Sequence, residues 1–260
     1  MAVIDVCTFN GENEIWDIRY NILSPFVDEF IVCEATKTFS GKDKPLYFKE
    51  IQNKYKKVKY FVIDNWDDSD LWIEAIDSPN THGADHWEME FYIKESIINA
   101  LTHLNSNDTI FVGDCDEIVD PLHYHEDFEG ITKFKLRVYS YYLNNRSNEL
   151  FWGTVRFKLH ELERDYLNYI RNNNERKNTI EECGWHFTSM GGYEKVKQKL
   201  EDSYTEETYA SKSIMTNLKW NIENSKDFLG RDFKYWIDES QWPKYLQENK
   251  EKYLHLMRNA

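Results

Sequence analysis

The sequence has no long apolar run. A helix that crosses a bilayer needs roughly 18 or more consecutive apolar residues, and no window of the 260-residue chain approaches that length. The N-terminus also lacks a basic region followed by an apolar stretch, which a secretory leader requires. The sequence therefore predicts a soluble, cytoplasmic protein with no membrane span and no signal peptide.

Cysteine is scarce, and its four copies lie far apart, at Cys7, Cys33, Cys115 and Cys183. Common zinc sites need pairs of cysteine or histidine ligands a few residues apart, and this spacing provides none. Three of the four lie in apolar runs typical of strands. We expect buried free thiols in a reducing compartment.

Positive charge is in deficit. The chain has 32 Lys and Arg against 46 Asp and Glu, a net charge of −14 at pH 7. A field of this sign repels phosphate backbones and anionic lipid surfaces, so we expect neither nucleic-acid nor membrane partners. A nucleotide held by a local cation or a metal ion is still compatible with it. Solubility explains the acidity itself.

The first half alternates strand-like and helix-like segments. Strands are expected over 3–9, 28–36, 57–64 and 108–118, and helices over 10–23, after Pro45 and over 86–104. This order predicts an α/β fold with a doubly wound, mostly parallel sheet. Such sheets bind ligands at the carboxyl ends of their strands.

The second half changes character. Two longer alternating stretches, 133–144 and 154–162, are expected to pair antiparallel, and a short strand over 183–190 leads into a glycine turn. Residues 162–175, 193–224 and 242–257 read as helices. We find no repeat, low-complexity tract or linker, so residues 1–260 are predicted to form one domain with a smaller antiparallel part and a helical C-terminal extension.

A predicted strand ends in carboxylates in FVGDCDEIVD, residues 111–120. Residues two apart on a strand share a face, so Asp114 and Asp116 are expected to converge while Cys115 points into the core. Like charges that close are costly unless a cation lies between them. Oxygen ligands favour Mg²⁺ or Mn²⁺, although acidic turns after strands are also common without metal. The pattern is not an EF-hand loop.

Two further stretches carry polar side chains. His186 lies in CGWHFTSMGG and is either a core histidine bonded to the backbone or a third metal ligand. Glu34 ends the second strand, and the loop after it offers the Thr38 hydroxyl and the positive charges of Lys42 and Lys44. That loop is either an ordinary polar connection or part of a binding site.

Five stretches together, in this order, resemble glycosyltransferase family 17: NGENEIWDIRYNIL, VDEFIVCEATKTFSGKDKPLYF, HWEMEFYIKESI, FVGDCDEI and GWHFTS. This family contains the β-1,4-N-acetylglucosaminyltransferases that add the bisecting GlcNAc to N-glycans, with shorter microbial and viral relatives. The resemblance implies a GT-A-type fold, with a nucleotide-binding half over 1–120, an acceptor-side half over 121–205 and the helical extension over 206–260. It also implies a UDP-sugar donor, Mn²⁺ or Mg²⁺, and inversion of the anomeric centre.

The resemblance also assigns residues around the acidic strand end. Asp114 and Asp116 match the family's D-x-D motif, with Asp116 as the direct metal ligand and Asp114 nearer the donor ribose or sugar. Glu117 extends the motif. His186 is a candidate metal or diphosphate contact, and Lys199 lies where the family often has a basic residue that suits a diphosphate.

A second set of assignments concerns the donor. Glu34 and the loop through Thr38 to Lys44 match the family's strand-end Glu and following loop, which implies nucleotide or donor contact. Glu90 with Lys94 matches a Glu-x-x-x-Arg pattern on the helix before the D-x-D strand. Lysine replaces arginine here, so a bidentate clamp on phosphate or carboxylate is not expected.

Inverting transfer needs a general base for the acceptor hydroxyl and closure against water. Spacing does not choose among the candidate bases Glu34, Glu88, Glu90, Glu117 and Asp85. The polar loop over 77–88 is a candidate lid or a plain surface loop.

Without a membrane anchor, the chain is expected to be a bacterial or viral member, in the host cytoplasm if viral. Its acceptor is then expected to be a surface polysaccharide, lipopolysaccharide or capsid glycan. A metal-dependent phosphohydrolase and a non-catalytic carbohydrate-binding protein are the alternative functions.

Overall fold

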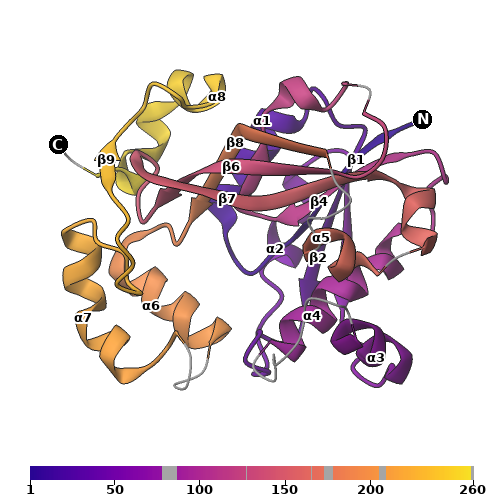
Figure 1. The fold of residues 1–260 in the computed structure, drawn as a ribbon, viewed down its shortest axis with the longest axis horizontal. Helices are drawn as coiled ribbons and strands as arrows, with labels where there is room; N and C mark the ends of the chain where they lie inside the picture. Colours follow the sequence, from indigo (N-terminus) through magenta and orange to yellow (C-terminus); the bar gives the residue numbers. More distant parts are fainter. Residues whose placement is uncertain (78–86, 127, 165, 173–177, 205–208, 259–260) are drawn as a thin grey trace.

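A mixed nine-stranded sheet organises the protein (Figure 1). The computed structural model describes residues 1–77, 87–126, 128–164, 166–172, 178–204 and 209–258. The strands are β1 (Val3–Thr8), β2 (Glu29–Ala35), β3 (Val58–Ile63), β4 (Thr109–Asp114), β5 (Glu117–Val119), β6 (Thr132–Ser140), β7 (Asn145–Lys158), β8 (Asn178–Thr188) and β9 (Tyr235–Ile237). Their order is β3-β2-β1-β4-β7-β6-β8-β5, and β9 pairs with β7.

The first four strands of that order, β3, β2, β1 and β4, are all parallel. They are connected by α1 (Asn13–Leu23), α2 (Phe48–Ile51), α3 (Ser69–Asp77) and α4 (Glu88–Glu95). Thr8 is in register with both Cys33 and Asp114, so the carboxyl ends of β1, β2 and β4 meet at one edge. The predicted doubly wound, mostly parallel sheet is confirmed, in a form consistent with a GT-A-like fold.

Alternate residues of these strands pack into opposite layers, which explains their continuous apolar sequences. Cys7 and Val32 face a layer that contains α1, while Val6 and Ile31 face the layer with α4 and α5 (Leu167–Asn172). All four cysteines are buried and free, as predicted.

The segment over 86–104, predicted as one helix, is α-helical only in its first part. Within the described residues, α4 ends at Glu95, and a 3-10 helix, Ser96–Leu101, follows it. The Ser96 hydroxyl donates to the carbonyl of Tyr92 at 2.7 Å, a bond four residues back that competes with regular helix geometry.

The second half supplies an antiparallel part, as predicted. β7 pairs antiparallel with both β4 and β6, β8 runs parallel to β6, and β5 pairs antiparallel with β8. The helices here are α5, α6 (Gly192–Ser203), α7 (Lys212–Glu223) and α8 (Lys244–Glu248). The long strands extend toward the C-terminal elements, of which α7, α8 and β9 gather at the opposite end of the molecule from α3 (Figure 1). The end of α6 approaches α4, where the rings of Tyr204 and Trp87 are in contact.

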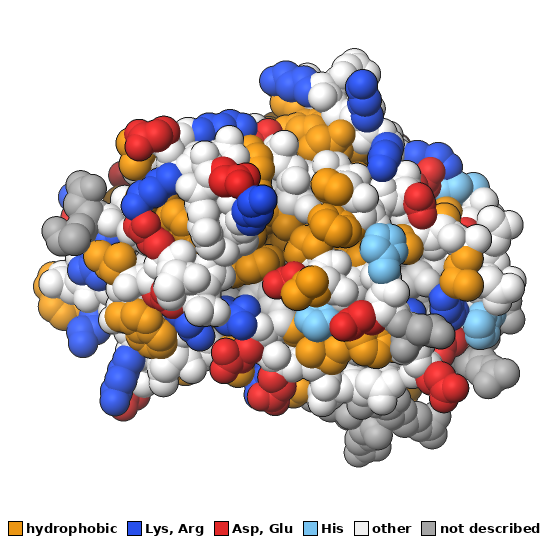
Figure 2. Space-filling view, turned by 90° about the horizontal axis from the view of Figure 1, so that it is seen from above, with side chains coloured by type: hydrophobic (Ala, Val, Ile, Leu, Met, Phe, Trp, Pro, Cys, Tyr) orange, Lys and Arg blue, Asp and Glu red, His pale blue; other side chains and the backbone are white. Residues whose placement is uncertain are grey.

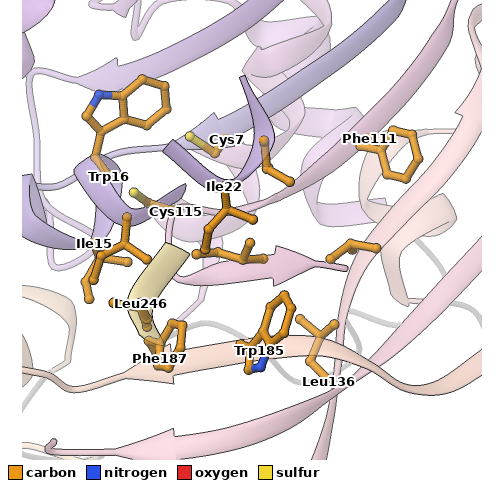
Figure 3. Packing of buried hydrophobic residues seen from close by; sticks show 14 of the residues in the cluster. Cys7, Ile15, Trp16, Ile22, Phe111, Cys115, Leu136, Trp185, Phe187 and Leu246 are labelled. Carbon is orange, nitrogen blue, oxygen red and sulfur yellow. The ribbon is translucent and has the colours of Figure 1, made fainter. Parts of the chain in front are cut away.

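The C-terminal extension is joined to the rest by more than helices. It also contributes β9, which the sequence did not predict, and Ser147 and Tyr235 are partners in its pairing with β7. Trp16 of α1, Phe187 of β8 and Leu246 of α8 belong to one buried cluster (Figure 3). The extension therefore shares the main hydrophobic core.

The outer surface shows no single charged face in the view of Figure 2, where basic and acidic side chains are interspersed between hydrophobic patches. Among the described helices, none has both the length and the apolar character needed to cross a bilayer.

The predicted strand over 108–118 is interrupted. β4 ends at Asp114, Cys115 and Asp116 form a turn, and β5 begins at Glu117. Glu117 is paired with His186 of β8. The expectation that Asp114 and Asp116 share one strand face is therefore wrong. The turn instead places the Asp116 carboxylate beside His186 of β8, while the Asp114 carboxylate contacts Lys94 of α4 and Arg171 of α5.

Candidate functional site

A cavity of about 380 Å³ lies at the carboxyl edge of the parallel strands. This is the edge where sheets of this kind bind ligands. Three parts of the chain line it. Where the parallel strands end, the lining residues include Thr8 and Asp114, the last residues of β1 and β4, and Thr38, Lys44 and Asp116 in the connections that follow β2 and β4. The other two parts are Glu149, Phe151 and His186 on β7 and β8, and Lys199, Tyr204, Asp227, Arg231 and Tyr235 from the C-terminal region. The cavity thus joins both halves of the sheet to the C-terminal elements.

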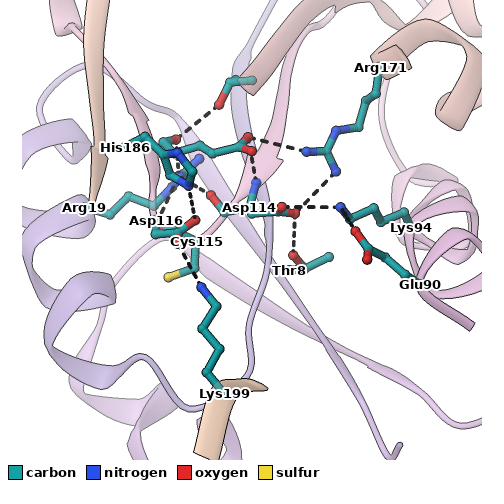
Figure 4. A network of polar contacts seen from close by, with 12 residues as sticks. Thr8, Arg19, Glu90, Lys94, Asp114, Cys115, Asp116, Arg171, His186 and Lys199 are labelled. Carbon is teal, nitrogen blue, oxygen red and sulfur yellow. Dashed lines mark hydrogen bonds and ion pairs between the residues drawn. The ribbon is translucent and has the colours of Figure 1, made fainter. Parts of the chain in front are cut away.

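A buried arginine on α1 fixes the turn that carries the two aspartates (Figure 4). Arg19 is fully buried and makes a bidentate pair with Asp5, at 2.7 and 2.9 Å. Its other terminal nitrogen donates to the carbonyls of Asp114, at 3.1 Å, and Glu117, at 2.7 Å. The turn's carbonyl groups are therefore satisfied by a side chain where they lack strand partners.

Asp114 is held by cations on two sides (Figure 4). One carboxylate oxygen accepts from Thr8 at 3.0 Å and from Arg171 at 3.3 Å, and the other from Lys94 at 3.3 Å. Burial alone would raise the pKa of Asp114, but Lys94 and Arg171 outweigh it and hold that pKa far below its usual value. Lys94 also binds Glu90 at 2.5 Å, so it bridges two carboxylates.

Asp116 faces a different pair of partners. One oxygen lies 3.3 Å from the Lys199 ammonium and the other 3.5 Å from Nε2 of His186. Burial raises the pKa of Asp116, but the charges of Lys199 and His186 outweigh it and lower the pKa to about 2. Burial lowers the pKa of His186, whereas Asp116 raises it, and the net shift is upward. The His186 ring also packs on Phe151, with centroids 4.3 Å apart.

Asp116 and His186 suit a divalent ion better than Asp114 does. Their facing atoms are 3.5 Å apart, and two ligands that each bind an ion at about 2.1 Å can be separated by that distance. The buried Nδ1 of His186 has no hydrogen-bond partner among the described residues. Both oxygens of Asp114 accept hydrogen bonds from cations, whereas on Asp116 one oxygen does so, from Lys199 at 3.3 Å.

The described part of the chain contains no group of three or more His, Cys, Asp or Glu side chains placed to hold a metal. Asp116 and His186 alone would leave the other positions of an ion to donor oxygens and water. Mg²⁺ is often bound in this way, by one or two carboxylates together with substrate phosphates.

Glu34 lies outside the cavity. It is fully buried, and one oxygen accepts from Lys44 at 3.1 Å and the backbone N–H of Tyr47 at 2.8 Å. The other accepts from the N–H of Phe48 at 2.9 Å and the Tyr60 hydroxyl at 2.7 Å. Glu34 thus fixes the loop after β2 and the start of α2. Of the residues predicted in this region, Thr38 and Lys44 line the cavity.

Glu117 is also buried, at 1% exposure, and lies behind the cavity wall. It accepts from the backbone N–H of Asp114 at 3.0 Å and pairs with Arg171 at 3.4 Å. Burial and the nearby charge of Asp114 raise the pKa of Glu117. A Cβ at Gly113 would lie 2.7 Å from its carboxylate, so this glycine makes room for it.

The three other candidates for the general base are Glu90, Glu88 and Asp85. Glu90 lines the cavity, while Glu88 is exposed and does not line it. Asp85 and most of the candidate lid lie outside the described residues, which exclude 78–86.

Sequence reasoning missed several residues of the site. Arg171 comes from α5, and nothing in its local sequence marks it as the partner of Asp114. Glu149 on β7 and the segment from Asp227 to Tyr235 form another wall of the cavity. Their distance in sequence from the D-x-D turn left no local signal.

Comparison with known proteins gives a family match over most of the chain. The model of glycosyltransferase family 17 matches residues 1–219. The β-1,4-mannosyl-glycoprotein 4-β-N-acetylglucosaminyltransferases of Rattus norvegicus and Homo sapiens are each 27% identical over 126 residues, which is 45% of this chain and 21% of each relative. The aligned part thus spans about a fifth of the length of these curated relatives.

Among solved structures, the CTP:phosphocholine cytidylyltransferase from Streptococcus pneumoniae aligns with a TM-score of 0.33 and 10% identity, over 70% of this chain and 90% of that one. A TM-score at this level supports no inference about function.

Proposed function

The chain belongs to glycosyltransferase family 17, and from this premise we propose that it transfers a sugar, GlcNAc in the first instance, from a UDP-sugar to a glycan hydroxyl. We include in this proposal a requirement for Mn²⁺ or Mg²⁺ and inversion of the anomeric centre. One observation carries it: the Asp116 carboxylate faces the cavity between His186, at 3.5 Å, and Lys199, at 3.3 Å, at the ligand-binding edge of the sheet.

The metal's contribution would be to neutralise the charge that develops on the leaving diphosphate. Asp116 and His186 are the residues that would hold it. Lys199 has 34% of its side chain exposed and adds a positive charge on the same side. These side chains, with a metal ion, would provide a local site for a diphosphate in a protein whose net charge is −14.

Other residues of the cavity would orient the donor. The side chain of Asp114 is 31% exposed and fixed in place by cations, so it is able to accept a hydrogen bond from a ribose or sugar hydroxyl. Thr38 and Lys44 lie on the loop after β2 and line the same cavity. Their neighbour Glu34 acts through this loop by holding it, and is not proposed to touch the donor.

The acceptor is proposed by class only, as a glycan hydroxyl. The curated relatives are named for a mannosyl-glycoprotein acceptor, but they are much longer than the part that matches this chain. A bacterial or viral surface polysaccharide, lipopolysaccharide or capsid glycan is the proposed source of that hydroxyl.

The test is a transfer assay. The protein is incubated with Mn²⁺, a set of UDP-sugars and a panel of oligosaccharide acceptors, and the products are followed by UDP release and mass spectrometry. We expect an acceptor that gains one sugar, and loss of this product in Asp116→Asn but not in Glu181→Gln, a surface control whose side chain is 55% exposed. Phosphate release from simple phosphate esters would favour a phosphohydrolase. Glycan binding without donor turnover would favour a binding protein.

A further inference from the structure

Among the residues that the structure describes, six carboxylates line the cavity: Glu12, Glu90, Asp114, Asp116, Glu149 and Asp227. Five of them are engaged within hydrogen-bond or close ion-pair distance. Glu12 accepts the N–H of Asn10 at 2.6 Å, and Asp227 accepts from Arg231 at 2.7 Å. Glu90 and the two aspartates of the turn are bound by the cations described above.

Glu149 is the exception among the described residues. Its carboxylate accepts no hydrogen bond from them, and the nearest cation, Arg231, is 3.9 Å away. Its side chain is 24% exposed, so it is partly shielded yet open to the cavity. A carboxylate with unused lone pairs beside a cavity is free to accept a proton from a ligand.

The position of Glu149 on β7 separates it from the proposed diphosphate site. Glu149 and Phe151 are two residues apart and both line the cavity, and the ring of Phe151 packs on His186. Two residues of a strand cover about 7 Å. Glu149 therefore lies on the cavity wall formed by β7, one strand step beyond the ring that packs on His186, and it is not among the side chains that surround Asp116.

We infer that Glu149 is the general base of the transfer reaction, an assignment that rests on the proposed function. A Glu149 oxygen takes the proton of the acceptor hydroxyl. The hydroxyl oxygen then forms the new bond to the anomeric carbon, and the bond from that carbon to the diphosphate oxygen breaks, with its electron pair leaving on UDP. The proton remains on Glu149 until products leave, so no other reactant is consumed.

The groups that face Glu149 suit this role. Arg231 and Asp227 lie on the segment before β9, Tyr235 on β9, and His186 on β8. Burial, aided by Asp227, raises the pKa of Glu149 above its ordinary value, although Arg231 and His186 oppose the shift. A carboxylate base works better when its pKa is closer to the working pH.

The assignment also suggests a role for the C-terminal wall of the cavity, which is the part of its lining that lies between Asp227 and Tyr235. Asp227, Arg231 and Tyr235 lie beyond residues 1–219, the part matched by the family model. They surround the carboxylate that would receive the acceptor's proton, so we place the acceptor hydroxyl between this wall and the D-x-D turn.

The experiment compares wild type, Glu149→Gln and the surface control Glu181→Gln. Affinity for UDP with Mn²⁺ is measured by calorimetry, and turnover of UDP-GlcNAc by UDP release with the acceptor panel. General-base catalysis contributes about 10²–10⁴ in rate. We expect Glu149→Gln to lower kcat by at least about 100-fold while the UDP affinity stays within threefold, and Glu181→Gln to change neither.

A second variant, Glu149→Asp, retains the carboxylate but withdraws it by one methylene, and we expect an intermediate rate. Wild-type turnover together with a Glu149→Gln variant that keeps its rate within fivefold would overturn the assignment and leave the transferase proposal intact. A wild type that binds UDP and turns over no sugar nucleotide would instead refute the proposed function, and the assignment of Glu149 with it. Unchanged circular dichroism and UDP affinity show that the variants are folded.

Discussion

Arg19 provides a sharp test of how the fold positions the site. Its guanidinium pairs with Asp5 and donates to the carbonyls of Asp114 and Glu117, and neither Arg19 nor Asp5 has an exposed side chain. Arg19→Met keeps much of the apolar volume but removes every one of these bonds. Asp5 would retain one partner, the hydroxyl of Tyr124 at 2.8 Å.

The expected magnitude follows from this geometry. Breaking a buried ion pair by removing one partner costs about 3–5 kcal/mol, because a charge is left buried without compensation. The carbonyl of Glu117 would keep the Thr154 hydroxyl as a donor, at 3.1 Å. The loss at the carbonyl of Asp114 adds a desolvation cost of about 1–3 kcal/mol, which water that reaches the turn would reduce. We therefore expect Arg19→Met to lower the free energy of unfolding by at least about 4 kcal/mol, a large part of the 5–15 kcal/mol typical of a domain.

The assay is urea unfolding at pH 7, followed by tryptophan fluorescence. The matched control is Lys244→Met, whose lysine is 85% exposed, and we expect it to change stability by less than about 0.5 kcal/mol. The double variant Asp5→Asn with Arg19→Met should lose less than the sum of the two single variants, because no unpaired charge remains. A loss below about 1 kcal/mol for Arg19→Met would refute the claim that this arginine holds the turn.

Three further predictions concern the same region. Gly113→Ala places a Cβ 2.7 Å from the Glu117 carboxylate, and we expect urea unfolding to show a loss of about 1–3 kcal/mol; an unchanged midpoint would contradict the packing. Glu34→Gln leaves a buried donor facing the N–H of Phe48 or the other donors around it, and thermal unfolding should detect a loss of about 1–3 kcal/mol, whereas no shift would show that the loop does not depend on this carboxylate. Asp116 has a folded pKa of about 2 against 3.8, so its stabilising effect is complete above pH 3.8 and is lost as the pH falls through 2. Unfolding measured between those values should decline by up to about 2 kcal/mol more in wild type than in Asp116→Asn, and parallel curves would contradict the assignment.

The sequence was sufficient for the parallel half of the fold. Continuous apolar runs such as 28–36, separated by helical patterns, predict strands buried on both faces, and the structure confirms them. The location of the site at the carboxyl edge follows from the same topology. The resemblance to a known family added residue assignments, and Asp114, Asp116, His186 and Lys199 do meet in space.

The limits of sequence reasoning are physical. A glutamate at a strand end either faces a cavity or binds the backbone after it, and only the fold shows that Glu34 does the second. Residues 114–118 read as a continuous strand because Cys115 and Ile118 are apolar, yet the strand breaks where Arg19 binds the carbonyls. Glu149 reaches the cavity through the pairing of distant strands, which leaves no local pattern in the sequence.

The central claim is that Asp116 and His186 hold a metal against the diphosphate of a UDP-sugar. Its most direct test is calorimetric titration of UDP, GDP and CMP, each with and without Mn²⁺, into wild type, Asp116→Asn and His186→Ala. We predict UDP binding that requires Mn²⁺ in wild type and is lost in both variants. UDP binding that is equally tight without metal, or that survives both substitutions, would contradict the claim.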